Sequence, residues 1–284
     1  MRAVVAGVDL TAMGRRVAER AGMMAESSDV PLLLLHVLEP VAEAMIDPSL
    51  ARLMREHQRS EAERLAQWAR EKTKAAVDLE VVKGSPSWEL TARAKTASMV
   101  VVGSSSIDAF SVGPVAKRVA RKASADTLVV RRQPRVPYRK VIAAVDFSEH
   151  SRAAMDRALS LFPTADITAL YSLPSRFDSM LAGAGLFTEE LEASRGARLG
   201  MAEERMAEFT AAWDGDIRAL VVDGPPSETI EEVVRRRGAD LVIAASRGAS
   251  ATRMVLLGTV AEGLVNQAPC DVLIARSRAP FRRP

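Results

Sequence analysis

Five short runs of apolar residues alternate with longer, more polar segments in the first half of the chain. Each run has four to eight residues and ends at a polar or turn-forming position, which indicates a strand buried in a parallel sheet. Of the intervening segments, Val17–Met24 has a helical pattern, and residues 48–76 place Leu65, Trp68 and Ala69 on a single helical face. The predicted strands are Ala3–Val8, Pro31–Leu38, Asp78–Val82, Met99–Gly103 and Thr127–Val130.

The same order of runs begins again after a linker with two prolines, Arg132–Pro137. Asp146 ends the first run of the second half and lies 137 residues after Asp9, which ends the first run of the first half. This internal repeat predicts two domains, residues 1–132 and 138–280. The runs of the second half are Lys140–Phe147, Ile167–Pro174, Ala219–Val222, Leu241–Ala245 and Val272–Ala275.

Strands that alternate with helices predict an α/β fold, here two doubly wound, Rossmann-like domains. Each would have a five-stranded parallel sheet with helices on both faces. In such sheets ligands bind at the carboxyl ends of the strands, beside the point where the strand order reverses. Asp9 and Asp146 end the first strands of the two halves, and glycine-bearing loops follow the fourth strands. We therefore expect any ligand to lie between these two places.

The stretch from Asp240 to Arg276 predicts a strand, a glycine-bearing loop, a helix and a second strand. Gly258 and Thr259 stand where the helix begins, so backbone N–H groups and a hydroxyl are available there. That arrangement suits an anion, most often a phosphate. The alternative interpretation is a tight turn between strand and helix, since isolated Gly-x-x-Gly spacings are common.

Composition and charge narrow the class of protein. The chain has 284 residues, 48% of them hydrophobic and 26% charged, with a formal net charge of +3. That charge is too small to indicate a nucleic-acid partner, and no aromatic residues interleave with the basic ones. No apolar run approaches the roughly 18 residues of a membrane span, and the first strand follows Met1 so closely that we expect no leader segment. The single cysteine, Cys270, predicts no disulfide, and we expect a cytoplasmic protein.

No catalytic or metal motif stands out in the sequence. The three histidines (His36, His57 and His150) are scattered and lack zinc spacing. Neither a Gly-x-Ser-x-Gly elbow nor a Gly-x-x-x-x-Gly-Lys-Ser/Thr loop occurs, and no nucleophile–base pair is evident. We therefore expect a binding protein rather than an enzyme, with no resident metal.

Several motifs, in the same order in both halves, give the chain a family resemblance. They are Val145–Ser151, Gly224–Pro226, the loop from Ala245 to Val260, and Ala268–Ile274. With these motifs the chain resembles a tandem member of the universal stress protein family over nearly all of its length. The resemblance implies the adenine nucleotide alpha hydrolase-like fold with strand order 3-2-1-4-5. It also implies an ATP loop of the form Gly-x2-Gly-x9-Gly-Ser/Thr.

The second half fits that loop with one departure, since Ala245 stands at the first glycine. Its methyl group would be tolerated with a negative φ and costly with a positive one. The resemblance places Asp146 near the adenosine, Ser172 near the adenine, and Thr259 at the phosphates, and it implies ATP as the cofactor. The predicted site residues are Ala144, Asp146, Ser172, Ala245, Arg247, Gly248, Gly258, Thr259 and Val260. An alternative role for Asp146 is to cap the following helix.

The first half departs further from the pattern. Gly103 matches, but Ser106 replaces the second glycine, only six residues separate it from Gly113, and Pro114 replaces the Ser/Thr. Proline offers neither a hydroxyl nor an N–H group. We therefore expect this half not to bind ATP and to serve in pairing with the second half.

Pairing within the chain is predicted through the fifth strands, Thr127–Val130 and Val272–Ala275, because both are short apolar edge strands. A homodimer of the whole chain is a second candidate assembly. Two functions remain open at this point. One is a nucleotide-binding stress protein, and the other is a nucleotide-free interaction protein in which both sites are relics.

Overall fold

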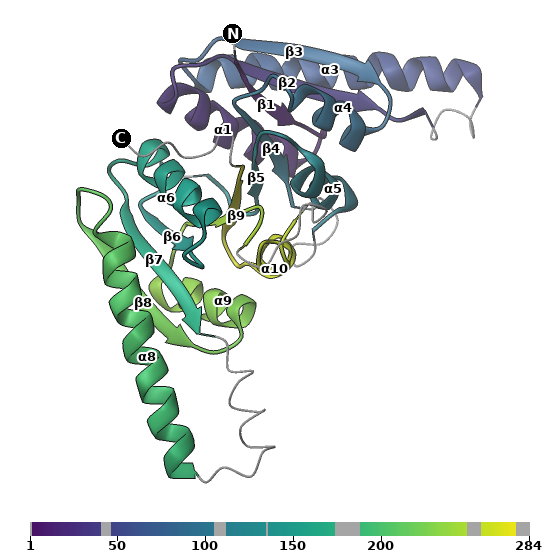
Figure 1. Ribbon diagram of the computed structural model, residues 1–284. Coiled ribbons are helices and arrows are strands. Elements are labelled where there is room, and N and C mark those ends of the chain that lie inside the picture. Colours follow the sequence, from purple (N-terminus) through teal and green to yellow (C-terminus); the bar gives the residue numbers. More distant parts are fainter. Residues whose placement is uncertain are drawn as a thin grey trace. The chain divides into compact units, whose positions relative to one another are not determined.

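The computed structural model describes residues 2–40, 47–104, 112–134, 136–173, 188–248 and 257–276. These residues form two compact units (Figure 1). The first unit contains the chain up to Pro137 together with Val265–Arg276, and the second contains Tyr138–Leu264. The last strand of the chain therefore belongs with the first unit.

The first unit is a twisted parallel sheet with the strand order β3-β2-β1-β4-β5. Val4 of β1 pairs with Leu32 of β2 on one side and with Met99 of β4 on the other. The order reverses beside β1, as predicted for a doubly wound fold. The strands are β1 Val4–Gly7, β2 Leu32–Leu38, β3 Val77–Lys83, β4 Met99–Gly103 and β5 Asp126–Val130.

Helices cover both faces of this sheet, with α1 packed against α3 and α4 packed against α5. Local sequence explains where they begin. The Thr11 side chain accepts a hydrogen bond from the N–H of Met13 and caps α1, while α3, α4 and α5 each begin with a proline. The helices are α1 Ala12–Ser27, α3 Pro48–Lys72, α4 Pro86–Arg93 and α5 Pro114–Lys122.

The second unit repeats this topology with the order β8-β7-β6-β9. Val141 of β6 pairs with Ile167 of β7 and with Leu241 of β9, again in parallel. The strands are β6 Lys140–Ala144, β7 Asp166–Leu173, β8 Ile217–Asp223 and β9 Leu241–Ala245. The helices of this repeat are α6 Glu149–Leu161, α8 Thr188–Thr210, α9 Pro226–Arg237 and α10 Thr259–Gln267. The predicted class, two doubly wound α/β repeats, is confirmed.

The fifth strands of the two repeats pair with each other. Strand β10, Asp271–Ala275, lies antiparallel to β5, with Leu273 opposite Leu128 at the centre of the register. Both strands are buried along their whole length. The predicted contact is confirmed, and it explains why β10 belongs with the first unit.

Polar contacts at the two ends of this strand pair are reciprocal. Asp126 accepts a hydrogen bond from the N–H of Arg276 at 2.8 Å, and Asp271 accepts one from the N–H of Arg131 at 2.7 Å. The two guanidinium groups also donate to backbone carbonyls near the helix ends, Arg276 to Ala120 and Arg131 to Val265. The corresponding residues of the two repeats are 145 positions apart in each case: Asp126 and Asp271, Arg131 and Arg276, and Ala120 and Val265. The β5–β10 contact therefore has internal two-fold symmetry.

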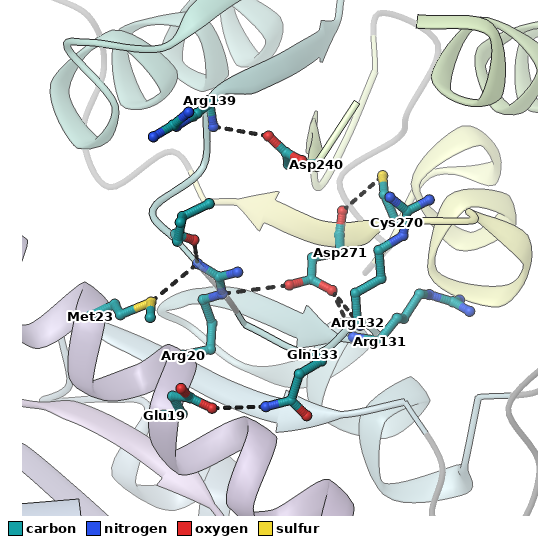
Figure 2. A network of polar contacts seen from close by, with 11 residues as sticks. Glu19, Arg20, Met23, Arg131, Arg132, Gln133, Arg139, Asp240, Cys270 and Asp271 are labelled. Carbon is teal, nitrogen blue, oxygen red and sulfur yellow. Dashed lines mark hydrogen bonds and ion pairs between the residues drawn. The ribbon is translucent and has the colours of Figure 1, made fainter. Parts of the chain in front are cut away.

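Asp271 also binds a buried arginine (Figure 2). Its Oδ2 lies 3.7 Å from Nε of Arg20, and its Oδ1 accepts from the N–H groups of Arg131 and Arg132. The Arg20 and Asp271 side chains are only 6% and 1% exposed. Arg20 further donates to the carbonyl oxygen of Val136. One carboxylate thus joins α1, β10 and the start of the linker.

Two predicted helix boundaries differ from the structure. The helix predicted over Val17–Met24 is one turn or more longer at its start, because Thr11 caps it and the apolar pattern there is weak. The helix predicted over residues 48–76 ends at Lys72, since the chain turns extended at Thr73. The predicted loop residue Ser106 and the strand end Pro174 lie outside the described residues.

Candidate functional site

Asp146 follows β6 and holds the turn into α6. Its Oδ1 accepts hydrogen bonds from the N–H of Ser148 at 3.1 Å and from the hydroxyl of Ser148 at 2.5 Å. Ser148 in turn accepts from the N–H of Ser151 and caps α6. The carboxylate therefore supports the helix cap through Ser148, which is close to the capping role considered from the sequence.

The residue after Asp146 has an unusual backbone conformation. Phe147 has a φ of +63°, and among the described residues other than glycine only Asp29 shares a positive φ. A left-handed conformation costs a residue with a side chain roughly 1–2 kcal/mol. The Phe147 ring contacts Tyr171 at 4.5 Å between centroids, and the guanidinium of Arg205 lies 4.6 Å above it. The strain coincides with the predicted ligand position, as is common at functional sites.

The two ends of the glycine loop meet beside this carboxylate. A Cβ on Gly248 would lie only 2.6 Å from Oδ2 of Asp146, so this close approach requires glycine. The N–H of Gly258 donates to the carbonyl of Ser246 at 2.8 Å, which closes the loop. The structure thus brings Asp146, Gly248 and Gly258 together at the carboxyl ends of β6 and β9.

The helix that follows begins at the predicted residue. Thr259 is the first residue of α10 and is exposed, and Val260 is half-buried. N–H groups in the first turn of a helix have no partner within the helix, so they are available to an anion. Arg247, half-buried, precedes Gly248 on the same loop.

Ala245 departs from the glycine pattern without backbone strain. It does not share the positive φ of Asp29 and Phe147, so its methyl group meets no conformational penalty. At the equivalent position, Gly103 could not carry a Cβ, which would lie 2.5 Å from Cγ of Met13 and 3.3 Å from Val17. By the 137-residue offset, the counterparts of Met13 and Val17 are His150 and the smaller Ala154. Where the strand residue is larger (Ala245 in place of Gly103), one of the two facing helix residues is smaller (Ala154 in place of Val17).

Two predicted residues belong to the interior of the second repeat. Ala144 is the last residue of β6 and is buried. Ser172 is also buried, and its hydroxyl donates to the carbonyl of Gly224 at 2.7 Å. This bond ties β7 to the loop after β8. It uses the one proton of the hydroxyl and leaves the oxygen available as an acceptor.

The first repeat places its own aspartate in a similar way. Oδ1 of Asp9 accepts from the N–H and hydroxyl of Thr11 and from the N–H of Gly14. The N–H of Gly113 donates to the carbonyl of Ser104, as that of Gly258 does to Ser246 in the second repeat. The loops differ at the next residue, because Pro114 begins α5 and supplies neither the N–H nor the hydroxyl that Thr259 offers.

A cavity of about 540 Å³ lies at this place in the first repeat. It is bounded by the carboxyl ends of β1, β2 and β4 and by residues from α1, α3, α4 and α5. Apolar side chains predominate in its wall, and Asp9 and His36 also line it. The sequence analysis did not predict a cavity here. The apolar residues that line it come from four helices, and only their packing in the fold brings them together.

Neither a metal centre nor a membrane span is found in the described part of the chain. No three His, Cys, Asp or Glu residues there are grouped as a metal ion would require. None of the helices described is both long enough and apolar enough to cross a bilayer.

The model of the universal stress protein family matches residues 1–131 and, separately, residues 137–276. The chain belongs to the universal stress protein family. A universal stress protein of Methanocaldococcus jannaschii is 28% identical over 143 residues, which cover 49% of this chain and 82% of that one. A putative universal stress protein of Staphylococcus aureus is 27% identical over 150 residues, covering 50% and 86%.

Solved structures support the same fold over the whole chain. A universal stress protein from Archaeoglobus fulgidus has a TM-score of 0.72 at 19% identity, covering 96% of this chain and 98% of that one. A putative universal stress protein from Pseudomonas aeruginosa has a TM-score of 0.63 at 16% identity, covering 97% and 93%. The tandem arrangement of two universal stress protein repeats is therefore shown.

An aromatic and cationic cluster surrounds Phe147, the residue after Asp146, and was not predicted from the sequence. Phe209 contacts Phe147 and Trp213, and the guanidinium of Arg152 lies 4.7 Å from its ring centre. Phe209 lies near the end of α8 and is buried, and Trp213 follows that helix and is half-buried. The contribution of Arg152 depends on how α6 packs, and no local pattern indicates it.

Proposed function

We propose that this tandem universal stress protein binds one adenine nucleotide, ATP, in its second repeat (residues 138–280). The observation that carries the proposal is the meeting of Asp146, Gly248 and Gly258 beside the start of α10. It supports a site with a carboxylate on one side and a glycine loop leading to helix N–H groups on the other. That combination suits a ribose hydroxyl and a phosphate.

Six of the nine predicted residues then have roles that their surroundings allow. Asp146 would accept from a ribose hydroxyl, and the Ser172 oxygen would accept from the adenine amino group. Thr259 and Val260 would donate N–H groups to the phosphates, with the Thr259 hydroxyl as a further donor. Arg247 would add a charge-assisted hydrogen bond. Gly248 would keep the loop close to Asp146.

The first repeat (residues 1–132) would not bind ATP in this way. Pro114 supplies neither an N–H group nor a hydroxyl at the first position of α5, where the second repeat has both in Thr259. A lost hydrogen bond to a charged group is worth roughly 1.5–3 kcal/mol. Losing two would weaken nucleotide binding by at least about a hundredfold.

Binding without turnover is the function proposed. The predicted site residues offer one carboxylate and several donors, and no nucleophile lies paired with a base among them. The protein would then act in the stress response as a binding protein whose state depends on whether ATP is bound.

The alternative, a nucleotide-free interaction protein that joins other chains through its sheet edges, has less support. The edges of β5 and β10 pair with each other inside the chain. The paired edges of these two strands therefore have no free backbone groups with which to pair with a strand of a second copy.

A thermal melt with and without ATP tests the proposal. Ligand that binds only the folded state raises the melting temperature, so wild-type protein should gain stability with ATP. Thr259→Pro should remove that gain, because it deletes the N–H and the hydroxyl together. The variant should still fold, since Pro114 begins α5 at the equivalent position.

Thr259→Ser is the matched control, because it keeps both donors and should keep the ATP effect. Absence of any ATP effect on the wild-type protein would contradict the proposal. An effect that survives in Thr259→Pro would place the nucleotide elsewhere.

A further inference from the structure

The cavity of the first repeat is large enough for a ligand of its own. Its volume, about 540 Å³, lies in the range of small-molecule sites, roughly 300–1,000 Å³. Its position at the carboxyl ends of β1, β2 and β4 is where doubly wound folds bind ligands. The wall includes Val8, Leu10, Val37 and Leu90.

Charge and hydrogen bonding make this cavity unsuited to a polyphosphate. Pro114 removes from this loop both the N–H and the hydroxyl that Thr259 offers in the second repeat. The charged residues of the wall are Asp9, Glu39 and Arg55, two carboxylates against one guanidinium. An anionic ligand would meet a net negative lining.

Two polar residues of the wall, Asp9 and His36, offer hydrogen-bond acceptors. Every hydrogen bond that Asp9 accepts from the described residues goes to Oδ1, which leaves Oδ2 as an acceptor. His36 is 7% exposed, and its Nδ1 donates to the carbonyl of Val8 at 3.0 Å. In the neutral ring Nε2 is then an acceptor, and this buried atom has no partner in the described part of the chain. A ligand that carries a hydroxyl or N–H group would meet the Asp9 carboxylate, which lines the cavity, while Nε2 of His36 is buried beneath the wall.

The cavity depends on residues that differ between the repeats. Gly7 pairs with Leu35 in the first repeat as Ala144 pairs with Leu170 in the second. The next residues, His36 and Tyr171, are therefore equivalent, as are Leu10 and Phe147. In the second repeat the Phe147 and Tyr171 rings contact each other at 4.5 Å. In the first repeat the two smaller side chains line open space instead.

Exposed apolar residues stand beside the cavity on α3. Met54 lines the cavity and is 39% exposed, and Leu50 and Leu53 on the same part of the helix are 47% and 62% exposed. Apolar side chains at the cavity and next to it favour an apolar ligand.

We infer that the first repeat binds an uncharged, mainly apolar small molecule that donates a hydrogen bond, at a site separate from the nucleotide site of the second repeat. The degenerate phosphate loop is then a change of ligand class rather than a loss of binding.

Two fluorescent probes with the same ring skeleton test this inference on the full chain. N-phenyl-1-naphthylamine is uncharged and carries one N–H, and 8-anilino-1-naphthalenesulfonate adds an anionic sulfonate. The uncharged probe should bind with one site per chain. The sulfonate probe should bind at least about tenfold more weakly. Equal affinities would overturn the inference.

Variants locate the probe. Val37→Trp fills the cavity and should reduce the affinity for N-phenyl-1-naphthylamine at least about tenfold. Leu53→Trp is the matched control, because Leu53 is exposed and does not line the cavity. Should Val37→Trp fail to fold, Met54→Glu places a charge at the cavity from an exposed helix position, with Leu53→Glu as its control. Unchanged probe affinity in the cavity variant would overturn the inference.

ATP separates this site from the nucleotide site. Excess ATP should not displace N-phenyl-1-naphthylamine, and Val37→Trp should keep the stabilisation by ATP. Displacement of the probe by ATP in the wild-type protein, together with loss of the stabilisation by ATP in Val37→Trp, would assign the cavity to nucleotide and overturn the inference. Failure of ATP to stabilise the wild-type protein would contradict the proposed function alone, since the probe titration is read independently.

Discussion

Close contacts between atoms decide which residues the glycine loop of the second repeat can contain. Gly248 is not left-handed, so its backbone would accept alanine, but its Cα faces the Asp146 carboxylate. Ala245 carries its methyl group without a positive φ. The two positions of the loop therefore differ in tolerance, and the glycine that touches the carboxylate is the stricter one.

Gly248→Ala should weaken ATP binding about tenfold. The added Cβ, 2.6 Å from Oδ2 of Asp146, would push the carboxylate away from the loop. Crowding of this kind costs typically 1–3 kcal/mol of stability as well. Calorimetric titration with ATP and urea unfolding measure the two effects.

Gly200→Ala is the control for this substitution. A Cβ there meets nothing within 4 Å, and the residue lies inside α8, so the variant should be as stable as the wild type or more so. Wild-type ATP affinity in Gly248→Ala would show that the contact with Asp146 does not serve the nucleotide.

Some residues of the candidate site can be predicted from the sequence, and the conformation and contacts of others cannot. Asp146, Gly248 and Gly258 could be found because each follows a strand or begins a helix, and the fold brings such positions together. The positive φ of Phe147 could not be predicted, nor could the Nε2 of His36, which has no partner among the described residues. Both depend on what packs around the residue, and neither leaves a pattern in the neighbouring sequence.

The β5–β10 ladder is the element that joins the repeats. Its register sets Leu128 opposite Leu273, and Asp126 and Asp271 receive N–H groups from the strand that is not their own. A buried carboxylate needs such partners. The ladder is thus fixed by polar contacts at its ends as well as by apolar burial along its length.

Asp271→Ala should destabilise the protein by about 3–5 kcal/mol, because it leaves the buried Arg20 guanidinium without its carboxylate. Urea unfolding gives the free energy. Asp240→Ala is the matched control, since Asp240 also accepts two backbone N–H groups, from Arg139 and Lys140, but near the surface. It should cost about 1 kcal/mol. Equal losses in the two variants would mean that the buried ion pair adds nothing.

Element order and type follow closely from the sequence, while boundaries do not. Apolar runs predicted all ten strands near their observed places, because strands buried on both faces leave an unbroken signal. The start of α1 was missed because its first turn is set by the Thr11 cap rather than by apolar spacing. The pairing of β5 with β10 could be predicted because both are apolar edge strands, whose backbone groups and side chains would otherwise be exposed.

At the scale of the whole molecule, the chain contains two repeats with one fold and a different proposed ligand site in each. The second repeat keeps a glycine loop beside its aspartate, and the first has a proline-headed helix and an apolar cavity instead. Their pairing through β5 and β10 means that neither fifth strand has a free edge on that side.

The first repeat expressed alone, as residues 1–132, should not be a stable monomer. Without β10 the β5 edge is open, and Asp126 loses the N–H of Arg276. An open apolar edge strand pairs with another chain or aggregates. Light scattering on the fragment should show dimers or larger species, and a well-folded monomer would contradict this account of the strand pair.

The most direct test of the central claim is the stoichiometry of ATP binding to the full chain, measured by isothermal titration calorimetry. The account predicts one ATP per chain, no binding heat in Thr259→Pro, and unchanged heat in the first-repeat variant Val37→Trp. Two ATP molecules per chain, or binding that survives Thr259→Pro and is lost in Val37→Trp, would contradict it.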